Sequence, residues 1–170
     1  MKSNFVQYYV EGEDEEKLIN ILKTDLETIR PGKVQKLNVV EREFTQARLI
    51  ALRPRTMVVL VFDTDTGHVN ILNKNLEKLK RCSAVSEIVT IPQVLNLEDE
   101  LVRSCSIKGI VELLDSKTKE EFKSDLIRVT NLAAKLREHQ FDIDQFWGKR
   151  PNSPYQHVEN MSYKVKLSTQ

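Results

Sequence analysis

Residues 57–67, MVVLVFDTDTG, decide the fold class of this chain. Residues 57–62 form an uninterrupted apolar run of β-branched and aromatic type, which is typical of a strand covered on both faces. Asp63 and Asp65 follow at its carboxyl end, where ligands of open α/β sheets bind. Because side chains alternate along extended backbone, we expect both carboxylates to converge on one hard cation.

A second acidic turn lies near the amino terminus. The apolar run Phe5–Val10, FVQYYV, predicts another strand, after which the chain reads EGEDEEKLINIL. Glu11 stands at the end of this strand, Gly12 permits a tight turn, and Glu15 falls one helical turn further on. The sequence therefore predicts that two separate strands deliver carboxylates to one edge of one sheet.

Strands and helices alternate through the first half of the chain. Apolar residues at helical spacing predict helices over 14–29, 43–52 and 69–82, and further strands are predicted over 33–40 and 86–91, the last stopped by Pro92. Such alternation implies a parallel sheet. We expect an α/β core over residues 1–95, with a mainly parallel four-stranded sheet flanked by helices.

The pattern changes after Pro92. Short helices are expected over 97–105 and 107–114, and a T-x-x-E capping box at Thr118 predicts a single helix running to about His139. A further turn over 142–147 should bury Phe146 or Trp147. We expect a helical extension over 96–150 packed on the core, and then a tail over 151–170 that either includes a short strand over 163–167 or has none.

Composition and charge limit the classes of function. The chain has 170 residues, 40% of them hydrophobic and 30% charged, which indicates one globular domain rather than a disordered chain. The formal charge of +1 gives no strong overall field for nucleic acid, so any such binding must come from local patches.

The sequence shows no targeting pattern, and its two cysteines show no metal-ligand spacing. The sequence has no apolar stretch near the ~20 residues that a membrane span needs, and its amino terminus lacks the apolar core of a signal peptide. Cys82 and Cys105 lack metal-ligand spacing. We therefore expect a cytoplasmic protein with reduced cysteines and no membrane partner.

The two acidic motifs together resemble a known family. A strand ending in EGxxE, here Glu11 to Glu15, followed by an apolar strand ending in DxD, here Asp63 and Asp65, resembles the Toprim domain of topoisomerases, DnaG-type primases, small RNA maturases and OLD-family nucleases. The resemblance covers about half of the chain and implies a Toprim-like fold. It also implies that Glu11 is a general acid/base or metal ligand, that the aspartates are a metal pair, and that Glu15 completes the nuclease-type metal site.

The chain departs from the topoisomerase and primase pattern. Thr66-Gly67-His68 stands where those enzymes carry a third aspartate, which favours the OLD-like or RloB-like nuclease branch. That branch implies cleavage of DNA or RNA with Mg²⁺ or Mn²⁺, because two such ions about 4 Å apart stabilise the attacking and leaving oxygens. It also implies a role in anti-phage defence, with a separately encoded ATPase or other protein as the partner.

Further residues are candidates for the same site. Glu98 and Glu100 could add acidic ligands, although an acidic helix start capped by Asn96 is the simpler interpretation. His68 lies beside the DxD turn and could contact a phosphate.

Basic residues are mostly expected on solvated faces. Lys149 and Arg150, close to Trp147, are the better candidates for a phosphate-and-stacking contact with nucleic acid. Arg53 and Arg55 precede the central strand, so they should lie at the opposite edge of the sheet from the acidic turns.

Other interpretations fit the same motifs. FDTDT also resembles the first motif of haloacid-dehalogenase-type phosphatases, with Asp63 as nucleophile and Asp65 as acid/base, although the lysine and late acidic pair of that family cannot be placed. A catalytically degenerate Toprim-like module that binds or regulates a partner is a further alternative. The plainest interpretation is that these carboxylates only cap helices.

Overall fold

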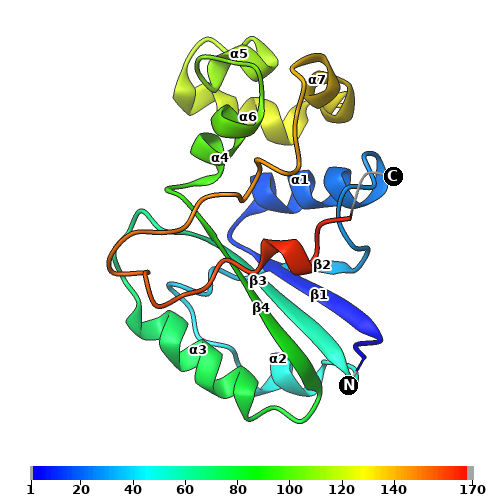
Figure 1. Cartoon of the computed structure of the whole chain (residues 1–170), viewed down its shortest axis with the longest axis vertical. Helices are drawn as coiled ribbons and strands as arrows, with labels where there is room; N and C mark the ends of the chain where they lie inside the picture. Colours follow the sequence, from blue (N-terminus) through cyan, green and yellow to red (C-terminus); the bar gives the residue numbers. More distant parts are fainter. Residues whose placement is uncertain (1, 168–170) are drawn as a thin grey trace.

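The computed structural model describes residues 2–167 and shows a four-stranded, all-parallel sheet flanked by helices (Figure 1). The sheet order is β2-β1-β3-β4, with each neighbouring pair parallel. The strands are β1 (Phe5–Val10), β2 (Lys33–Lys36), β3 (Thr56–Asp63) and β4 (Val85–Gln93). The predicted α/β fold class is confirmed, and the arrangement is consistent with a Rossmann-like fold.

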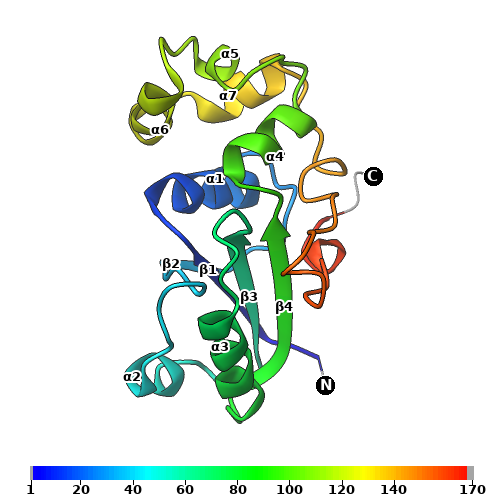
Figure 2. The ribbon, with the colours of Figure 1, turned by 90° about the vertical axis from the view of Figure 1, so that its left-hand side faces the viewer.

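Helices cover both faces of this sheet, and further helices lie beyond the carboxyl ends of its strands. Figure 2 shows α3 and the 3-10 helix η1 on opposite sides of β4, and α4 to α7 beyond the carboxyl end of that strand. The helices are α1 (Glu13–Thr24), α2 (Gln46–Ile50), α3 (Asn70–Lys80), α4 (Leu97–Ser104), α5 (Val111–Leu114), α6 (Lys119–Arg128), α7 (Leu132–Glu138) and η1 (Ser162–Lys164). None of the helices formed by the described residues has the length and apolar composition that a transmembrane span requires.

Two hydrophobic clusters separate the layers. One face of β1 contributes Tyr8 and Val10 to a cluster that includes α1 and continues into α4, α6 and α7. The other face contributes Tyr9 to a cluster with α3 and Phe44. The helices after β4 therefore share a core with the sheet. In β3 every residue before Asp63 is buried, as expected for a strand covered on both faces.

The prediction that the last strand stops at Pro92 is wrong. β4 continues to Gln93, with Pro92 opposite Phe62 and Gln93 opposite Asp63. Proline lacks a backbone N–H, but β4 is an edge strand, so the missing donor costs no bond on its open side. The two additional residues bring Gln93 next to Asp63 at the carboxyl end of the sheet.

The prediction of one helix from Thr118 to about His139 is also wrong. The segment divides into α6 and α7, because the backbone turns to an extended conformation at Val129, and β-branched residues and asparagine follow. Lys17 Nζ on α1 binds the carbonyl oxygens of Ile127 (2.9 Å) and Val129 at this break. The tertiary contact takes the place of the helical hydrogen bonds that end there.

The end of the chain forms less regular structure than a strand. Within 163–167, the 3-10 helix η1 is followed by a single antiparallel bridge between Ile29 and Lys166. Residues 168–170 of the predicted tail lie outside the described residues. Both Phe146 and Trp147 are buried, where one of them was expected.

A buried carboxylate fastens the helices to the sheet. Glu100 on α4 is fully buried, and its Oε1 accepts from the Val94 backbone N–H (2.9 Å) and lies 2.8 Å from Arg103 Nη2. Its Oε2 accepts from the Trp147 backbone N–H (2.9 Å). Both oxygens of Glu100 therefore have partners within the protein, and its role as an additional metal ligand stays a prediction.

We expect Glu100→Ala to lower the free energy of unfolding by about 3–5 kcal/mol, because it leaves two buried N–H donors without an acceptor and Arg103 without its paired anion. Urea unfolding followed by circular dichroism measures this. Asp99→Ala, one position earlier on α4, is the matched control and should cost less than about 1 kcal/mol. Equal losses in the two variants would contradict the structural role of Glu100.

Candidate metal site

Three carboxylates meet at the carboxyl edge of the sheet. Glu11, Glu15 and Asp63 each offer one oxygen, and these oxygens lie within 4.8 Å of one another. Glu11 directly follows β1, Glu15 lies in the first turn of α1, and Asp63 is the last residue of β3. We call these three residues the carboxylate group.

The sheet topology explains why the carboxylate group forms. β1 and β3 are parallel neighbours, so their carboxyl ends lie side by side. From this pair the sheet continues to β2 on one side and to β4 on the other, so the strand order reverses between β1 and β3. Ligand sites of open α/β sheets occur at such switch points. Residues more than 50 positions apart in the chain thus reach one place.

Gly12 and Glu15 form the turn that holds two of the three carboxylates together. The Gly12 backbone N–H donates to Glu15 Oε2 (3.0 Å), which fixes the side chain at the start of α1. A Cβ at position 12 would lie 3.1 Å from Asp14 Oδ1 and 3.4 Å from Glu15 Oε2. Glycine therefore leaves room for the carboxylates.

Burial and mutual repulsion disfavour the charged forms of the carboxylate group. Burial raises the pKa of Glu15 to about 10, with contributions from Asp14 and Asp63. Burial likewise raises the pKa of Asp63 to about 8, and the charge of Glu11 adds to this. The pKa of Glu11 is raised by burial and by Asp65. A divalent cation would offset these costs by pairing with all three anions, so the site has the electrostatics of a metal site.

Gln93 orients Asp63 through a short chain of hydrogen bonds. Its Nε2 donates to Asp63 Oδ1 (2.7 Å), and its Oε1 accepts from Trp147 Nε1 (3.1 Å). Because the indole N–H can only donate, it fixes which end of the amide faces Asp63. Gln93 was not among the predicted site residues because the predicted strand ends at residue 91, two residues before the end of β4. Its position at a strand end beside β3 was the available signal.

A cavity of about 510 Å³ opens over the carboxylate group. Basic side chains from β2, α2, α6 and the loop before α2 share its walls with the acids, namely Lys36, Arg42, Arg48 and Lys123. Lys123 comes from the helical extension and pairs with Glu98 (3.5 Å). The cavity thus combines acidic groups that suit a cation with basic groups that suit an anionic ligand.

Asp65 does not join the carboxylate group. It is exposed in a bend, because β3 ends at Asp63 and the alternation of an extended strand does not continue to position 65. Its charge still raises the pKa of Glu11 and Asp63, so it lies near the group. A role for Asp65 as a metal ligand stays a prediction.

The remaining predicted site residues lie outside the carboxylate group. Glu98 is paired with Lys123, and its charge raises the pKa of Asp63. His68 is exposed, and its carbonyl accepts from the Tyr155 hydroxyl (2.9 Å). Lys149 and Arg150 are exposed and do not line the cavity over the carboxylates. Their predicted contacts with nucleic acid stay predictions.

Comparisons with known protein families, with curated proteins and with solved structures found no match for this chain. The functional assignment therefore depends on the geometry of the site and on the motif resemblance.

We expect Glu15→Gln to raise the free energy of unfolding in EDTA at pH 8 by about 1–3 kcal/mol. The folded-state pKa of Glu15 lies above its ordinary value of 4.5, so its unfavourable contribution is absent below pH ~4.5 and grows as the pH rises toward 10. The gain should therefore vanish near pH 4. Thermal unfolding measures it, and Glu16→Gln in the same helical turn is the control. An equal gain at both pH values would contradict the electrostatic explanation.

We expect Gln93→Leu to weaken Mn²⁺ binding by about 10–100-fold, as for other residues that orient a ligand. Isothermal titration calorimetry measures the affinity. Trp147→Phe keeps the bond from Gln93 to Asp63 and removes only its support, so it should weaken binding less. Unchanged affinity in Gln93→Leu would show that Asp63 needs no such orientation.

Proposed function

We propose that this chain is a divalent-metal-dependent nuclease that cleaves phosphodiester bonds of DNA or RNA, with a Toprim-type site of the OLD-like or RloB-like branch. The observation that carries the proposal is the convergence of Glu11, Glu15 and Asp63 within 4.8 Å at the switch point of the sheet. The order and spacing of the EGxxE and DxD motifs support the same conclusion.

The donor set fits a hard divalent cation. Three carboxylates and no sulfur or imidazole make up the group, which suits Mg²⁺ or Mn²⁺. Such an ion would supply Lewis-acid stabilisation of the charge that develops on a phosphodiester. Glu11, Glu15 and Asp63 would hold it, and Gln93 keeps Asp63 in position through its 2.7 Å bond.

The basic residues of the cavity suit the anionic substrate. Arg42 and Arg48 reach the cavity from the side of β2, and Lys123 reaches it from α6. Guanidinium and ammonium groups bind phosphate oxygens, so these side chains would hold and orient the substrate backbone beside the cation. The helical extension thereby contributes directly to the site.

The phosphatase alternative has less support. It pairs Asp63 as nucleophile with Asp65 as acid/base, whereas Asp65 is exposed and lies outside the carboxylate group. A degenerate regulatory module would keep the fold and lose cleavage. The resemblance further suggests anti-phage defence and a separately encoded ATPase partner, which co-purification with proteins encoded beside this chain would test.

We expect the purified chain to cleave plasmid, single-stranded DNA or RNA when Mg²⁺ or Mn²⁺ is supplied, and EDTA to abolish this. Asp63→Asn and Glu11→Gln should lower the rate by at least about 100-fold, because each removes a ligand charge from the cation. Glu16→Gln removes one charge from the first turn of α1, outside the carboxylate group and its cavity, and should stay within a few-fold of the unmodified chain.

Cleavage that survives both substitutions would refute the proposed site. A chain that binds Mn²⁺ by calorimetry but cleaves none of the substrates would favour the regulatory module.

A further inference from the structure

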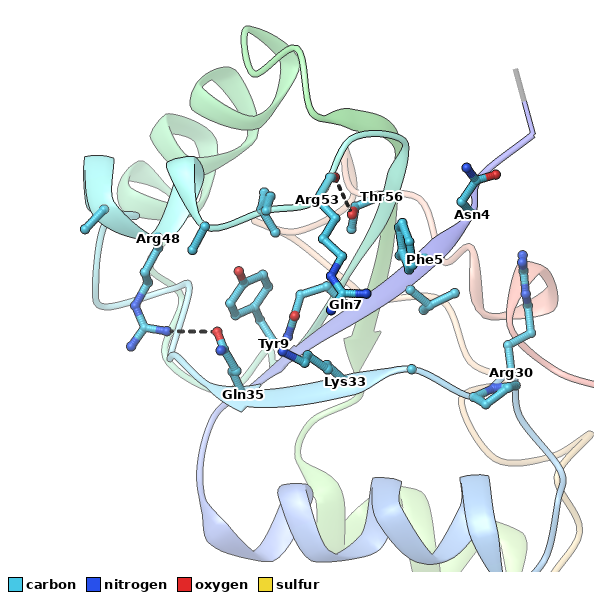
Figure 3. Close-up of a pocket in the computed structure, with 16 residues that line it drawn as sticks. Asn4, Phe5, Gln7, Tyr9, Arg30, Lys33, Gln35, Arg48, Arg53 and Thr56 are labelled. Atoms are coloured by element: carbon cyan, nitrogen blue, oxygen red, sulfur yellow. Dashed lines mark hydrogen bonds between the residues drawn. The ribbon is translucent and has the colours of Figure 1, made fainter.

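A second and larger cavity lies on the sheet face beside α2. It has a volume of about 690 Å³, within the range of pockets that bind small ligands (Figure 3). Its floor is formed by alternate residues of β1, with Gln7 and Tyr9 buried and Phe5 40% exposed. The facing wall comes from α2 and the segment that leads to β3.

The cavity exists because the elements around it are short. β2 has four residues, and α2 has five, none of which is buried. They cannot cover the amino-terminal part of β1 in the way that α3 covers the sheet next to them. A recessed part of the sheet face is left between β2 and α2.

The charge of this cavity is of one sign. Lys33, Arg48 and Arg53 line it, and none of its lining residues is an aspartate or glutamate. Arg30 lines it too, but its guanidinium is directed at Met57 Sδ (3.7 Å). On a chain with a formal charge of only +1, three cations around one cavity without acids are a local concentration that suits an anionic ligand.

The cavity also contains a stacked pair of planar groups, the Arg53 guanidinium and the Phe5 ring. The Arg53 guanidinium carbon lies 4.9 Å from the centre of the Phe5 ring, so the cation is stacked on the aromatic face. Figure 3 shows Arg53 extending over the floor of the cavity, between Phe5 and Tyr9. Guanidinium planes and exposed aromatic rings are the groups on which unpaired bases stack.

Arg48 joins this cavity to the one over the carboxylate group. It lines both, and its guanidinium contacts Gln35 Oε1 (3.5 Å) and the Lys36 carbonyl (3.4 Å) across β2. Tyr9 on the floor of one cavity is two residues from Glu11 in the other. In Figure 3, Arg48 and Tyr9 lie toward the carboxyl end of β1, and Phe5 lies toward its start.

From these observations we propose that the cavity beside α2 binds an unpaired nucleotide of a single-stranded nucleic acid whose backbone continues past Arg48 to the carboxylate group. Lys33 and Arg53 neutralise its phosphates, and the Arg53–Phe5 pair stacks on a base. A cavity of this volume admits one nucleotide and excludes a duplex. The link to the carboxylate group depends on the proposed nuclease function, whereas binding in the cavity does not.

The test is fluorescence anisotropy with labelled single-stranded DNA and RNA oligonucleotides in EDTA. Without a divalent cation no cleavage occurs, so the outcome is independent of the metal site. The variant is Lys33→Ala/Arg53→Ala; both side chains are exposed, so we expect the fold to be retained. Lys108→Ala/Lys117→Ala removes the same charge from exposed positions on the helical extension and is the matched control.

We expect the cavity variant to bind the strand at least about tenfold more weakly and to reduce the slope of log K against log salt by about 1.4, at roughly 0.7 per phosphate contact. The control should bind as the unmodified chain does. Equal affinities of all three proteins would overturn the proposal. A duplex or a free mononucleotide that binds as tightly as the strand would also overturn it, because either result removes the continuing single strand.

Discussion

The parallel pairing of β1 with β3 is the constraint on which the rest of the site depends. It sets the ends of two buried strands next to each other; Glu11 directly follows β1, and Asp63 is the last residue of β3. The chain therefore folds against a local electrostatic cost, since burial and like charge raise the pKa of Glu11, Glu15 and Asp63. Groups that are costly to bring together and yet fixed in place are typical of functional sites.

The structure around this edge keeps the carboxylates fixed. Gln93 on β4 donates a hydrogen bond to Asp63, and Trp147 donates one to Gln93. Glu100 in turn accepts a hydrogen bond from the Trp147 backbone N–H. These contacts connect the sheet edge to the segment after α7. The helical extension therefore contributes Trp147, which hydrogen-bonds to Gln93, and Lys123, which lines the cavity over the carboxylate group. It belongs to the same structural unit as the sheet, because one hydrophobic cluster extends through both.

The two cavities beside β2 differ in the charges of the residues that line them. At the carboxyl end of the sheet, acidic and basic residues share one cavity, whereas the cavity beside α2 is lined by basic residues without acids. Arg48 stands between the two. A net charge near zero therefore accompanies a local difference in charge between the two cavities.

The fold class and the two acidic motifs can be predicted from the amino-acid sequence alone. The apolar runs at 5–10 and 57–62 have the composition of strands buried on both faces, and that property is local enough to read without a structure. Parallel pairing then follows from the alternation of strands and helices, and it predicts that Glu11 and Asp63 end at one edge.

Features that depend on contacts between residues distant in the chain could not be predicted in this way. Pro92 stays within β4 because that strand is at the edge, and the helix predicted to run to His139 breaks where Lys17 binds its carbonyls. Asp65 lies outside the carboxylate group because β3 ends at Asp63, while Gln93 enters the site from another strand. The cavity beside α2 forms because β2 and α2 are too short to cover the amino-terminal part of β1. Periodicity reports which face of a segment is apolar, but not which segment will pack against it.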